Sequence, residues 1–428
     1  MKSNRPPRRT RRQFLKGAAA AAGGIAAAPY AITSTALGAG GRPPASERIV
    51  MGAIGIGGRG RYVMGAHMWN DDVQMVAVCD CQGPRRRAAR AAVNAKYGHR
   101  DCQAYVDLRE LLAREDIDAV CIATGDNWHS LASSLAVKAG KDVYCEKPVS
   151  VTVAESRALV ETIRRHGAIF QCGTQRRNVG NFVFAVHLAR SGKLGRLTAL
   201  HAERAWVETG VHFTTFPAEP EPPREVMAWD LWLGPAPWRA YSSRGYSRRF
   251  WRSHGDFSGG SITEWGSHTV DLCQWANRAD DTAPVEYRQT GDSGDVTARY
   301  ANGAELIIRK GLRFGSCPVR FEGEEGWIET GDSGQMEAYP ASLLAERRFR
   351  GGYPANDHVR EFLDCVKTRK QPRSTANAAH HSITACHCAN ICVRLGRTVK
   401  WDPAREEFLG DEDANRLRAR AIREPWRL

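Results

Sequence analysis

The chain has 428 residues, of which 42% are hydrophobic and 25% are charged, and its formal net charge is +14. Its length suggests two or three domains with cores of their own, and this share of apolar residues excludes a disordered chain. The long uncharged apolar stretch lies near the N-terminus, which excludes a membrane protein with several spans.

The positive charge is concentrated at the N-terminus. Residues 1–45 contain eight Lys or Arg and no Asp or Glu, so the remainder has 53 basic and 47 acidic residues. A formal charge of +6 without a long basic run gives no reason to expect a nucleic-acid partner.

The N-terminal segment has the pattern of an export signal. It reads Thr10-Arg11-Arg12-Gln13-Phe14-Leu15-Lys16 and continues into an Ala/Gly-rich stretch over residues 17–28. The paired arginines, the Phe and the trailing Lys resemble a twin-arginine signal. We therefore expect export through the twin-arginine (Tat) machinery to the periplasm or another extracytoplasmic compartment. The alternatives are a disordered basic tail and an uncleaved anchor, although so short an Ala/Gly-rich segment spans a bilayer poorly.

The twelve cysteines predict neither a disulfide framework nor a metal site. Cys79, Cys121 and Cys145 lie in apolar runs typical of strands, where cysteine behaves as a small buried hydrophobic residue. A second group follows no standard zinc spacing and falls within residues 378–395, whose apolar periodicity predicts one helix; it comprises His380, His381, Cys386, His387, Cys388 and Cys392.

A nucleotide-binding turn is predicted at the start of the globular part. Residues 49–56 form an apolar run typical of a buried strand, and Gly55-Ile56-Gly57-Gly58-Arg59-Gly60 satisfies G-x-G-x-x-G before a helical segment. In this motif Gly55 permits a tight turn, Gly57 lets the backbone approach a pyrophosphate, and Gly60 lets helix and strand pack closely. The first turn of the helix, with Gly58 and Arg59, then offers N–H groups to the phosphates.

Alternating strands and helices predict a doubly wound parallel sheet, an α/β fold. Further strands are expected at residues 73–79, 118–124 and 142–145, separated by helical stretches. Asp80 ends the second strand about 20 residues beyond Gly60, where a carboxylate reads the ribose 2′-hydroxyl of NAD. Arg59, Arg61 and the arginines at 85–87 leave NADP open as a second cofactor.

Lys147 is predicted to lie beside the nicotinamide. It follows the strand at residues 142–145 within Glu146-Lys147-Pro148, and ligands of such sheets bind beyond the carboxyl ends of the strands. Pro148 also disfavours helical backbone geometry at Lys147, so its side chain extends from an open segment.

These motifs, with several further ones, resemble the glucose–fructose oxidoreductase / inositol dehydrogenase / rhizopine catabolism (Gfo/Idh/MocA) family over essentially everything after the leader. The further motifs are Thr124-Gly125-Asp126-Asn127-Trp128-His129, Gly173-Thr174-Gln175-Arg176-Arg177, Trp229-Asp230-Leu231-Trp232-Leu233-Gly234-Pro235 and Glu264-Trp265-Gly266-Ser267-His268.

The resemblance implies three regions: a signal and linker at 1–45, a Rossmann domain at 46–170 and an α/β domain at 171–428. The last would bind substrate and carry a large, mostly antiparallel open sheet that packs against another subunit in a homo-oligomer, a dimer or a tetramer. Strand-like runs at 197–202, 296–300 and 305–309 fit this expectation.

The resemblance also implies oxidation or reduction of sugars, polyols or related compounds with NAD(P). The family places an acid four residues before a histidine, here Glu264 and His268, a spacing that puts both on one helix face. We expect His268 to act as the general base near neutral pH, Glu264 to orient it or hold the substrate, and Lys147 to donate to the developing alkoxide. The family usually has Asp at the position of Glu264, which implies an adjusted pocket or a different substrate.

Other site residues follow from the same resemblance. Cofactor contacts are expected from Thr124, Asn127, His129, Glu146 and Gln175, and substrate contacts from Arg177, Trp251, Arg252 and Trp265. The pocket wall should come from the aromatic and basic segment at 204–256, which contains Trp206, Trp229, Trp232, Trp238, Trp251, Arg248, Arg249, Arg252 and His254. Within it, Trp232 and Trp238 are expected in the core or an interface.

Export implies a tightly held cofactor, because the periplasm offers no free pool of nicotinamide nucleotide. The leading hypothesis is therefore an exported oxidoreductase that oxidises one sugar and reduces another with a retained NAD. Two rival hypotheses remain: NAD-dependent glycoside cleavage through transient oxidation and elimination, and a sugar-binding protein without catalysis.

Overall fold

The computed structural model describes residues 42–204, 211–246, 248–291, 294–345, 347 and 356–428. The predicted export signal and Trp206 lie outside the described residues, as do the side chains of Arg248 and Arg249. Residues 49–428 form one compact unit.

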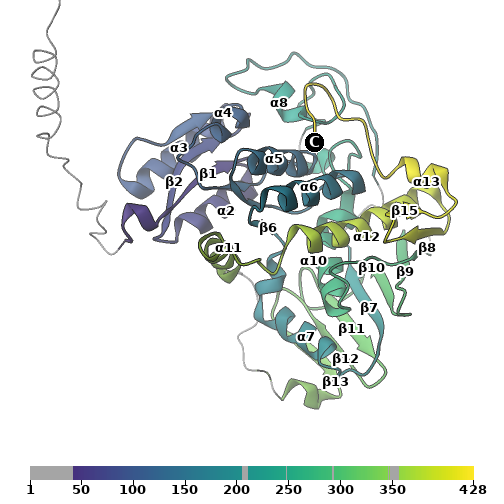
Figure 1. Cartoon of the computed structure of the whole chain (residues 1–428). Helices are drawn as coiled ribbons and strands as arrows, with labels where there is room; N and C mark the ends of the chain where they lie inside the picture. Colours follow the sequence, from purple (N-terminus) through teal and green to yellow (C-terminus); the bar gives the residue numbers. More distant parts are fainter. Residues whose placement is uncertain (1–41, 205–210, 247, 292–293, 346, 348–355) are drawn as a thin grey trace, which may run out of the picture. The chain divides into compact units, whose positions relative to one another are not determined.

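The first sheet has six parallel strands in the order β3-β2-β1-β4-β5-β6 (Figure 1). Almost every residue of β1, β4 and β5 is buried, in accord with their continuous apolar sequences. The strand order reverses between β1 and β4, and ligands of such folds bind beyond this point. The bounds are β1 (Ile49–Ile54), β2 (Val73–Cys79), β3 (Gln103–Tyr105), β4 (Ala119–Ile122), β5 (Asp142–Cys145) and β6 (Phe170–Cys172).

Helices cover this sheet, and one of them comes from the far end of the chain. The connecting helices are α2 (Gly58–Met68), α3 (Gly83–Tyr97), α4 (Leu108–Leu112), α5 (Asp126–Lys138) and α6 (Val153–His166). On α11 (Asn356–Thr368), Val359, Phe362 and Leu363 join the core of β1 and β2. The predicted domain boundary at residue 170 thus falls inside β6, and the first sheet's core includes residues beyond it.

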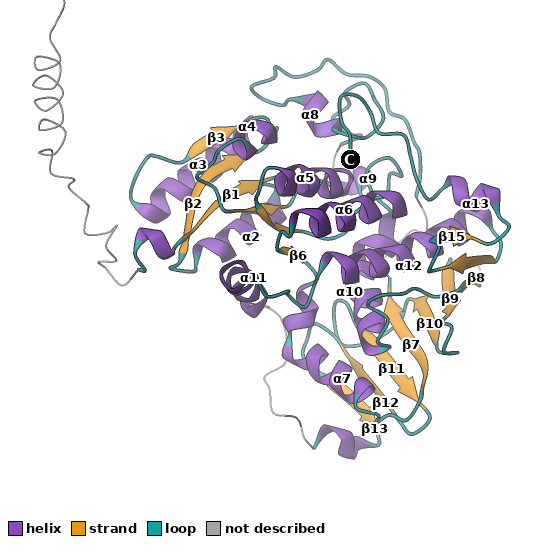
Figure 2. Ribbon diagram, viewed as in Figure 1, coloured by secondary structure: helices purple, strands orange, loops and turns teal. Residues whose placement is uncertain are grey.

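The second sheet has nine strands in the order β13-β12-β11-β7-β10-β9-β8-β14-β15 (Figure 2). β7 pairs with β10 in parallel, and the other neighbours pair antiparallel, as expected. The bounds are β7 (Leu197–Glu203), β8 (Glu286–Thr290), β9 (Asp295–Arg299), β10 (Glu305–Arg309), β11 (Val319–Gly323), β12 (Trp327–Thr330), β13 (Met336–Tyr339), β14 (Val399–Asp402) and β15 (Glu407–Phe408).

A row of helices, α5, α6, α12 (Ala376–Leu395) and α10 (Gly260–Ala276), runs from the first sheet to the second (Figure 1). α10 packs against α12 closely because Gly266 has no side chain: a Cβ there would lie 2.7 Å from Cys386 Sγ. The twelve cysteines are unpaired thiols, and Cys386, Cys388 and Cys392 are buried on α12. A short helix, α7 (Gly180–Arg190), also contacts α10.

Residues 226–246 and 248–257 form a segment that caps the first sheet, the capping segment, with the short helices α8 (Trp229–Leu233) and α9 (Arg248–Trp251). Its backbone pairs with the turn that follows β2, since Gly83 N donates to Val226 O at 2.8 Å and Ala228 N to Cys81 O at 2.9 Å. Within the described residues, the helices lack the length and apolarity required to cross a bilayer.

Candidate active site

A cavity of about 560 Å³ lies beyond the carboxyl ends of β1, β2 and β4. The glycine turn forms its floor. Gly55 has φ +81° and packs against the backbone of Ala123, while a Cβ on Gly60 would lie 1.9 Å from Gly55 O. The roles predicted for both glycines are therefore visible in the geometry, and Gly57, Gly58 and Arg59 line the cavity at the start of α2. We call this space the nucleotide cavity.

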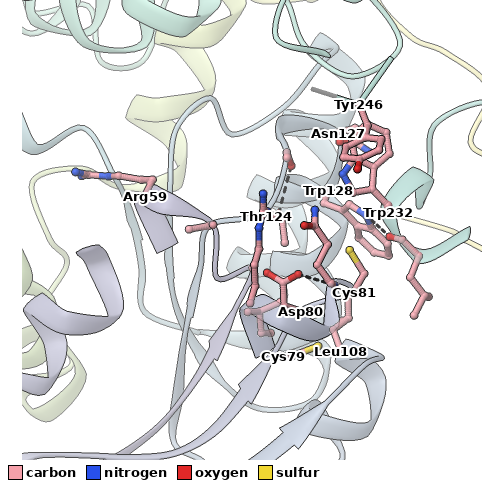
Figure 3. A pocket seen from close by; sticks show the side chains of 18 of the residues that line it. Arg59, Cys79, Asp80, Cys81, Leu108, Thr124, Asn127, Trp128, Trp232 and Tyr246 are labelled. Atoms are coloured by element: carbon pink, nitrogen blue, oxygen red, sulfur yellow. Dashed lines mark hydrogen bonds between the residues drawn. The ribbon is translucent and has the colours of Figure 1, made fainter. Parts of the chain in front are cut away.

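Asp80 lies in the wall of the nucleotide cavity (Figure 3). Its carboxylate accepts hydrogen bonds from Ile56 N at 2.6 Å and Gln82 N at 2.8 Å. Burial raises the pKa of Asp80, and these two donors oppose that shift. The carboxylate is thus fixed at the turn, where a ribose hydroxyl of a dinucleotide would lie.

Aromatic side chains close the other side of the nucleotide cavity. Figure 3 shows Trp128 of α5 near Trp232 and Tyr246 of the capping segment, with Arg59 on the opposite side. The segment is tied to α5, because Trp128 Nε1 donates to Leu231 O and Asn127 Nδ2 donates to Leu233 O, both at 2.9 Å. Asn127 therefore lines the nucleotide cavity and also binds the capping segment that closes it.

Two tryptophans of the capping segment differ from expectation. Trp232 stacks on Trp229 at 4.7 Å between ring centroids, but it also lines the nucleotide cavity, so it is more than a core residue. Trp238 is 70% exposed, which rules out the core and leaves the interface as the expectation for this residue.

A second cavity, of about 370 Å³, adjoins the first and contains Lys147. We call it the catalytic cavity. Lys147 Nζ donates to Glu264 O at 2.9 Å and lies 3.1 Å from Glu264 Oε1, and Arg252 also binds this carboxylate. The two cavities share five residues in their walls: Arg59, Ala123, Thr124, Trp251 and Arg252.

His268 lies on the same face of α10 as Glu264 and lines the catalytic cavity, but its surroundings differ from those of a base near neutrality. Arg176 Nη1 donates to His268 Nε2 at 2.8 Å, and Asp332 holds Arg176 by two further hydrogen bonds. Burial lowers the pKa of His268 well below its ordinary value, and the cations Arg176, Lys147 and Arg59 lower it further. The expected titration of His268 near neutral pH is therefore corrected. Its imidazole is neutral, and the Nε2 lone pair accepts a hydrogen bond from the Arg176 guanidinium.

Asp126, the first residue of α5, is a site residue that the sequence analysis did not select. It lines the catalytic cavity, is 3% exposed, and accepts a hydrogen bond from Ser258 Oγ at 2.6 Å. Burial raises the pKa of Asp126 to about 7, with a further contribution from the like charge of Glu264. Two carboxylates with different surroundings thus face one cavity.

Several predicted cofactor residues form a network at the junction of the cavities. Glu146 is buried, pairs with Arg59 Nε at 2.8 Å, and accepts from Gln175 Nε2 at 2.9 Å. Close contact between Glu146 and Gly173 leaves no room for a side chain there, since a Cβ would lie 2.9 Å from the carboxyl carbon. His129 shares a hydrogen bond of 2.6 Å with Pro148 O, which positions the segment that carries Lys147.

The structure corrects the substrate role expected for Arg177. Its side chain is 1% exposed, lies outside both cavities, and pairs with Asp271 at 2.8 Å and Asp280 at 2.7 Å. Its neighbour Arg176 lines the catalytic cavity instead.

Of the other residues predicted for the substrate pocket, some line the catalytic cavity and others lie outside it. Trp251, Arg252 and Trp265 line the catalytic cavity, together with Cys317 and Asp332, which the sequence analysis missed. His254 lines neither cavity and is buried beside Phe257.

His380, His381 and Glu406 offer ligand atoms within 4.8 Å of one another. His380 Nδ1 contacts Ser156 Oγ at 2.8 Å, and its Nε2 contacts Arg157 and Glu406. The Arg157 guanidinium also pairs with Glu406, so this carboxylate already has a cationic partner within the protein.

Comparison with protein families agrees with the two-sheet architecture and the glycine turn. Residues 49–174 match the model described as "Oxidoreductase family, NAD-binding Rossmann fold", and residues 195–428 match "Oxidoreductase family, C-terminal alpha/beta domain". The chain belongs to the Gfo/Idh/MocA oxidoreductase family.

Individual relatives in this family match only part of the chain. A 146-residue stretch is 30% identical to inositol 2-dehydrogenase of Salmonella typhimurium and covers 33% of this chain and 41% of that protein. A 113-residue stretch is 34% identical to 2,7-anhydro-N-acetylneuraminate hydratase of Mediterraneibacter gnavus and covers 25% of this chain and 29% of that protein. The matched stretches therefore span less than half of either relative.

The fold of this Gfo/Idh/MocA protein is similar to that of the WlbA dehydrogenase from Bordetella pertussis, solved with NADH and UDP-GlcNAcA. The TM-score is 0.59 at 17% identity, with coverage of 83% of this chain and 99% of that chain. At this identity the likeness shows the fold alone.

Proposed function

We propose that this protein is an exported NAD-dependent oxidoreductase that moves a hydride between its cofactor and a carbinol carbon of a sugar, a polyol or a sugar derivative. The observation that carries the proposal is the common wall of the two cavities, which joins the glycine turn to Lys147. The family membership and the inositol dehydrogenase among the relatives support it.

The nucleotide cavity fits a dinucleotide in this proposal. Gly57 and Gly58 leave the start of α2 open to phosphates, Asp80 faces the ribose position, and the Trp128–Trp232–Tyr246 wall suits an adenine ring. The carboxylate of Asp80 favours NAD, because it would repel a 2′-phosphate. When bound, NAD supplies the two-electron chemistry as hydride acceptor or donor.

The protein's own residues supply the electrostatic part of the reaction. Negative charge develops on the substrate oxygen when its hydroxyl proton leaves in oxidation, or when hydride reaches the carbonyl carbon in reduction, and Lys147 Nζ is the donor that we assign to it. Glu264 fixes this ammonium group through its backbone carbonyl and its carboxylate. A displacement of about 1 Å at such a site can cost about 100-fold in rate. The position of Lys147 is therefore matched to the longer side chain of Glu264.

We infer a neutral, polyhydroxylated substrate. Trp251 and Trp265 line the catalytic cavity, and aromatic rings suit the C–H faces of a sugar ring. The cations of the catalytic cavity already contact carboxylates of its walls: Arg59 with Glu146, Arg176 with Asp332, and Lys147 and Arg252 with Glu264. A substrate carboxylate would therefore meet cations whose charge is already balanced by carboxylates of the protein.

Export and cofactor retention belong together in this proposal. The leader favours export of a folded protein, and the capping segment covers one side of the nucleotide cavity. A nucleotide loaded in the cytoplasm would then be kept and recycled by alternating substrates.

A second candidate is glycoside cleavage through transient oxidation and elimination. The hydratase among the relatives favours it, and so does Asp126, because a carboxyl group that holds a proton can assist a leaving group. Release of the aglycone without accumulation of NADH would distinguish this reaction from net oxidation.

The test is to purify the exported protein, identify the nucleotide released on denaturation, and follow reduced-nicotinamide absorbance across neutral sugars, polyols and sugar acids. We expect bound NAD, and turnover with neutral substrates ahead of sugar acids. Lys147→Met should lower kcat/KM by roughly 10²–10³-fold with the nucleotide content unchanged. Lys138→Met, at the exposed end of α5, is the matched control. Full sugar binding without turnover in the wild type would support the non-catalytic alternative.

A further inference from the structure

The arrangement around His268 leaves the proton acceptor of the reaction unassigned. The Nε2 lone pair of His268 accepts from Arg176, which Asp332 holds in turn. A guanidinium can donate but not accept, so Nε2 cannot take a substrate proton while this contact exists. Another group in the wall of the catalytic cavity must do so.

Four carboxyl groups of the described residues line the catalytic cavity. Glu146 pairs with Arg59 and Asp332 pairs with Arg176, and the other two, Glu264 and Asp126, have opposite surroundings. Glu264 contacts the cations Lys147 and Arg252, which stabilise its ionised form. The Asp126 carboxyl group, in contrast, accepts a hydrogen bond from a neutral hydroxyl, that of Ser258. When two nearby carboxyl groups differ in this way, one ionises and the other keeps its proton.

The charged and titratable groups facing Asp126 come from several elements. α10 contributes Glu264, the segment after β5 contributes Lys147, and the capping segment contributes Arg252. Cys145, at the end of β5, is a buried thiol in its vicinity. The like charge of Glu264 and the burial of Asp126 favour the neutral acid, and the two cations oppose them.

We propose that Asp126 is a further catalytic residue, which holds a proton beside ionised Glu264 and exchanges it with the substrate oxygen. This inference rests on the proposed function. In oxidation the substrate O–H bond breaks and its proton passes to the Asp126 carboxylate. The C–H electron pair leaves as a hydride to NAD, and the C=O bond forms. In reduction the protonated Asp126 returns the proton to the oxygen.

The pH dependence of the two directions has opposite signs. Oxidation needs the carboxylate, so kcat/KM should rise with pH through a step near neutrality, whereas reduction needs the acid and should fall through the same step. Asp126→Asn should lower kcat/KM by roughly 10²–10⁴-fold and remove the step. Asp332→Asn changes another carboxylate of the same cavity and, like His268→Gln, should keep the step. Ser258→Ala should move the step to higher pH, because a donor to the carboxylate is lost.

Infrared spectroscopy provides a readout that does not depend on turnover. We expect the C=O band of a buried protonated carboxyl group in the wild-type protein below neutrality, its loss on raising the pH, and its absence in Asp126→Asn. A band with the same pH dependence that persists in Asp126→Asn, or a pH step that disappears in His268→Gln and stays in Asp126→Asn, would overturn the proposal. Because the band is measured without substrate, it decides the state of Asp126 even if the proposed oxidoreductase activity is not found.

Discussion

Asp126 and Glu264 illustrate how the surroundings of a side chain decide its charge. Both line the catalytic cavity, but Lys147 and Arg252 accompany Glu264, whereas Asp126 is buried at the start of α5. The pKa of Asp126 rises from 3.8 to about 7. The folded protein therefore binds a proton that the unfolded chain releases, and folding stability falls as the pH rises through this interval.

We expect Asp126→Asn to raise the free energy of unfolding by roughly 1–4 kcal/mol at about pH 8 and to change it little near pH 4. The reason is that the wild-type protein must ionise a buried acid above neutrality, and asparagine removes that requirement. Urea unfolding at the two pH values measures the difference. An equal effect at both would contradict the assigned charge state, and Asp332→Asn, which removes a partner of Arg176, should not stabilise at high pH.

Local patterns were sufficient for some site residues and insufficient for others. The glycine turn, Asp80 and Lys147 follow strands directly, so the sequence alone predicts their place at the edge of the first sheet. Arg176 and Arg177 lie in a 3-10 helix (Gln175–Asn178), where adjacent side chains point about 120° apart. Which of the two enters the cavity depends on the buried partners of Arg177, far along the chain.

At the scale of elements, Arg177 joins that 3-10 helix to α10. Its guanidinium is buried and paired with Asp271, which also accepts from Ser382 of α12. Removing one partner of a buried ion pair leaves an uncompensated charge. We therefore expect Arg177 to stabilise the packing of α10 and α12 and to have no role in substrate binding.

We expect Arg177→Met to lower the free energy of unfolding by about 3–5 kcal/mol and to leave KM nearly unchanged in the protein that remains folded. Arg165→Met removes an exposed pair with Glu161 and should change stability by less than about 1 kcal/mol. Denaturant unfolding and substrate titration of the same preparations provide the two readouts. A large rise in KM with little loss of stability would restore a substrate role for Arg177.

The capping segment has two tryptophans that allow a matched comparison. Trp232 lines the nucleotide cavity and Trp238 is 70% exposed. Because aromatic stacking on a base contributes about 1–3 kcal/mol, Trp232→Ala should weaken nucleotide binding by roughly 10–100-fold. Trp238→Ala should leave binding unchanged. Nucleotide content after extensive dialysis checks both variants, and equal losses would argue against an adenine site at this wall.

The sequence pattern predicted β1, β2, β4, β5, β7, β9 and β10, but it named none of the other strands and could not place the capping segment. Contacts such as Trp128 Nε1 to Leu231 O join residues that are 103 positions apart, and nothing in the local sequence marks them. For the same reason Asp332, which follows β12 and holds Arg176, was not foreseen. Motif spacing predicts which elements meet, and long-range side-chain pairs then complete the site.

For the whole molecule, the export prediction links the leader to the cofactor. We expect Arg11→Lys with Arg12→Lys to leave the protein in the cytosol with its nucleotide bound, since folding and loading precede export in this account. Cell fractionation of wild-type and variant cells, with nucleotide analysis of each fraction, measures location and loading separately. Unchanged extracytoplasmic location of the double variant would contradict the twin-arginine route.

The proposed function requires one dinucleotide to span the two cavities, with adenine at the Trp128–Trp232–Tyr246 wall and nicotinamide beside Lys147. A crystal structure of the purified protein with NAD and a neutral sugar tests it most directly. We expect the adenine between Trp128 and Trp232, and the nicotinamide and a sugar hydroxyl within contact of Lys147. Nucleotide bound elsewhere, or a sugar seated away from Lys147 and Asp126, would contradict it.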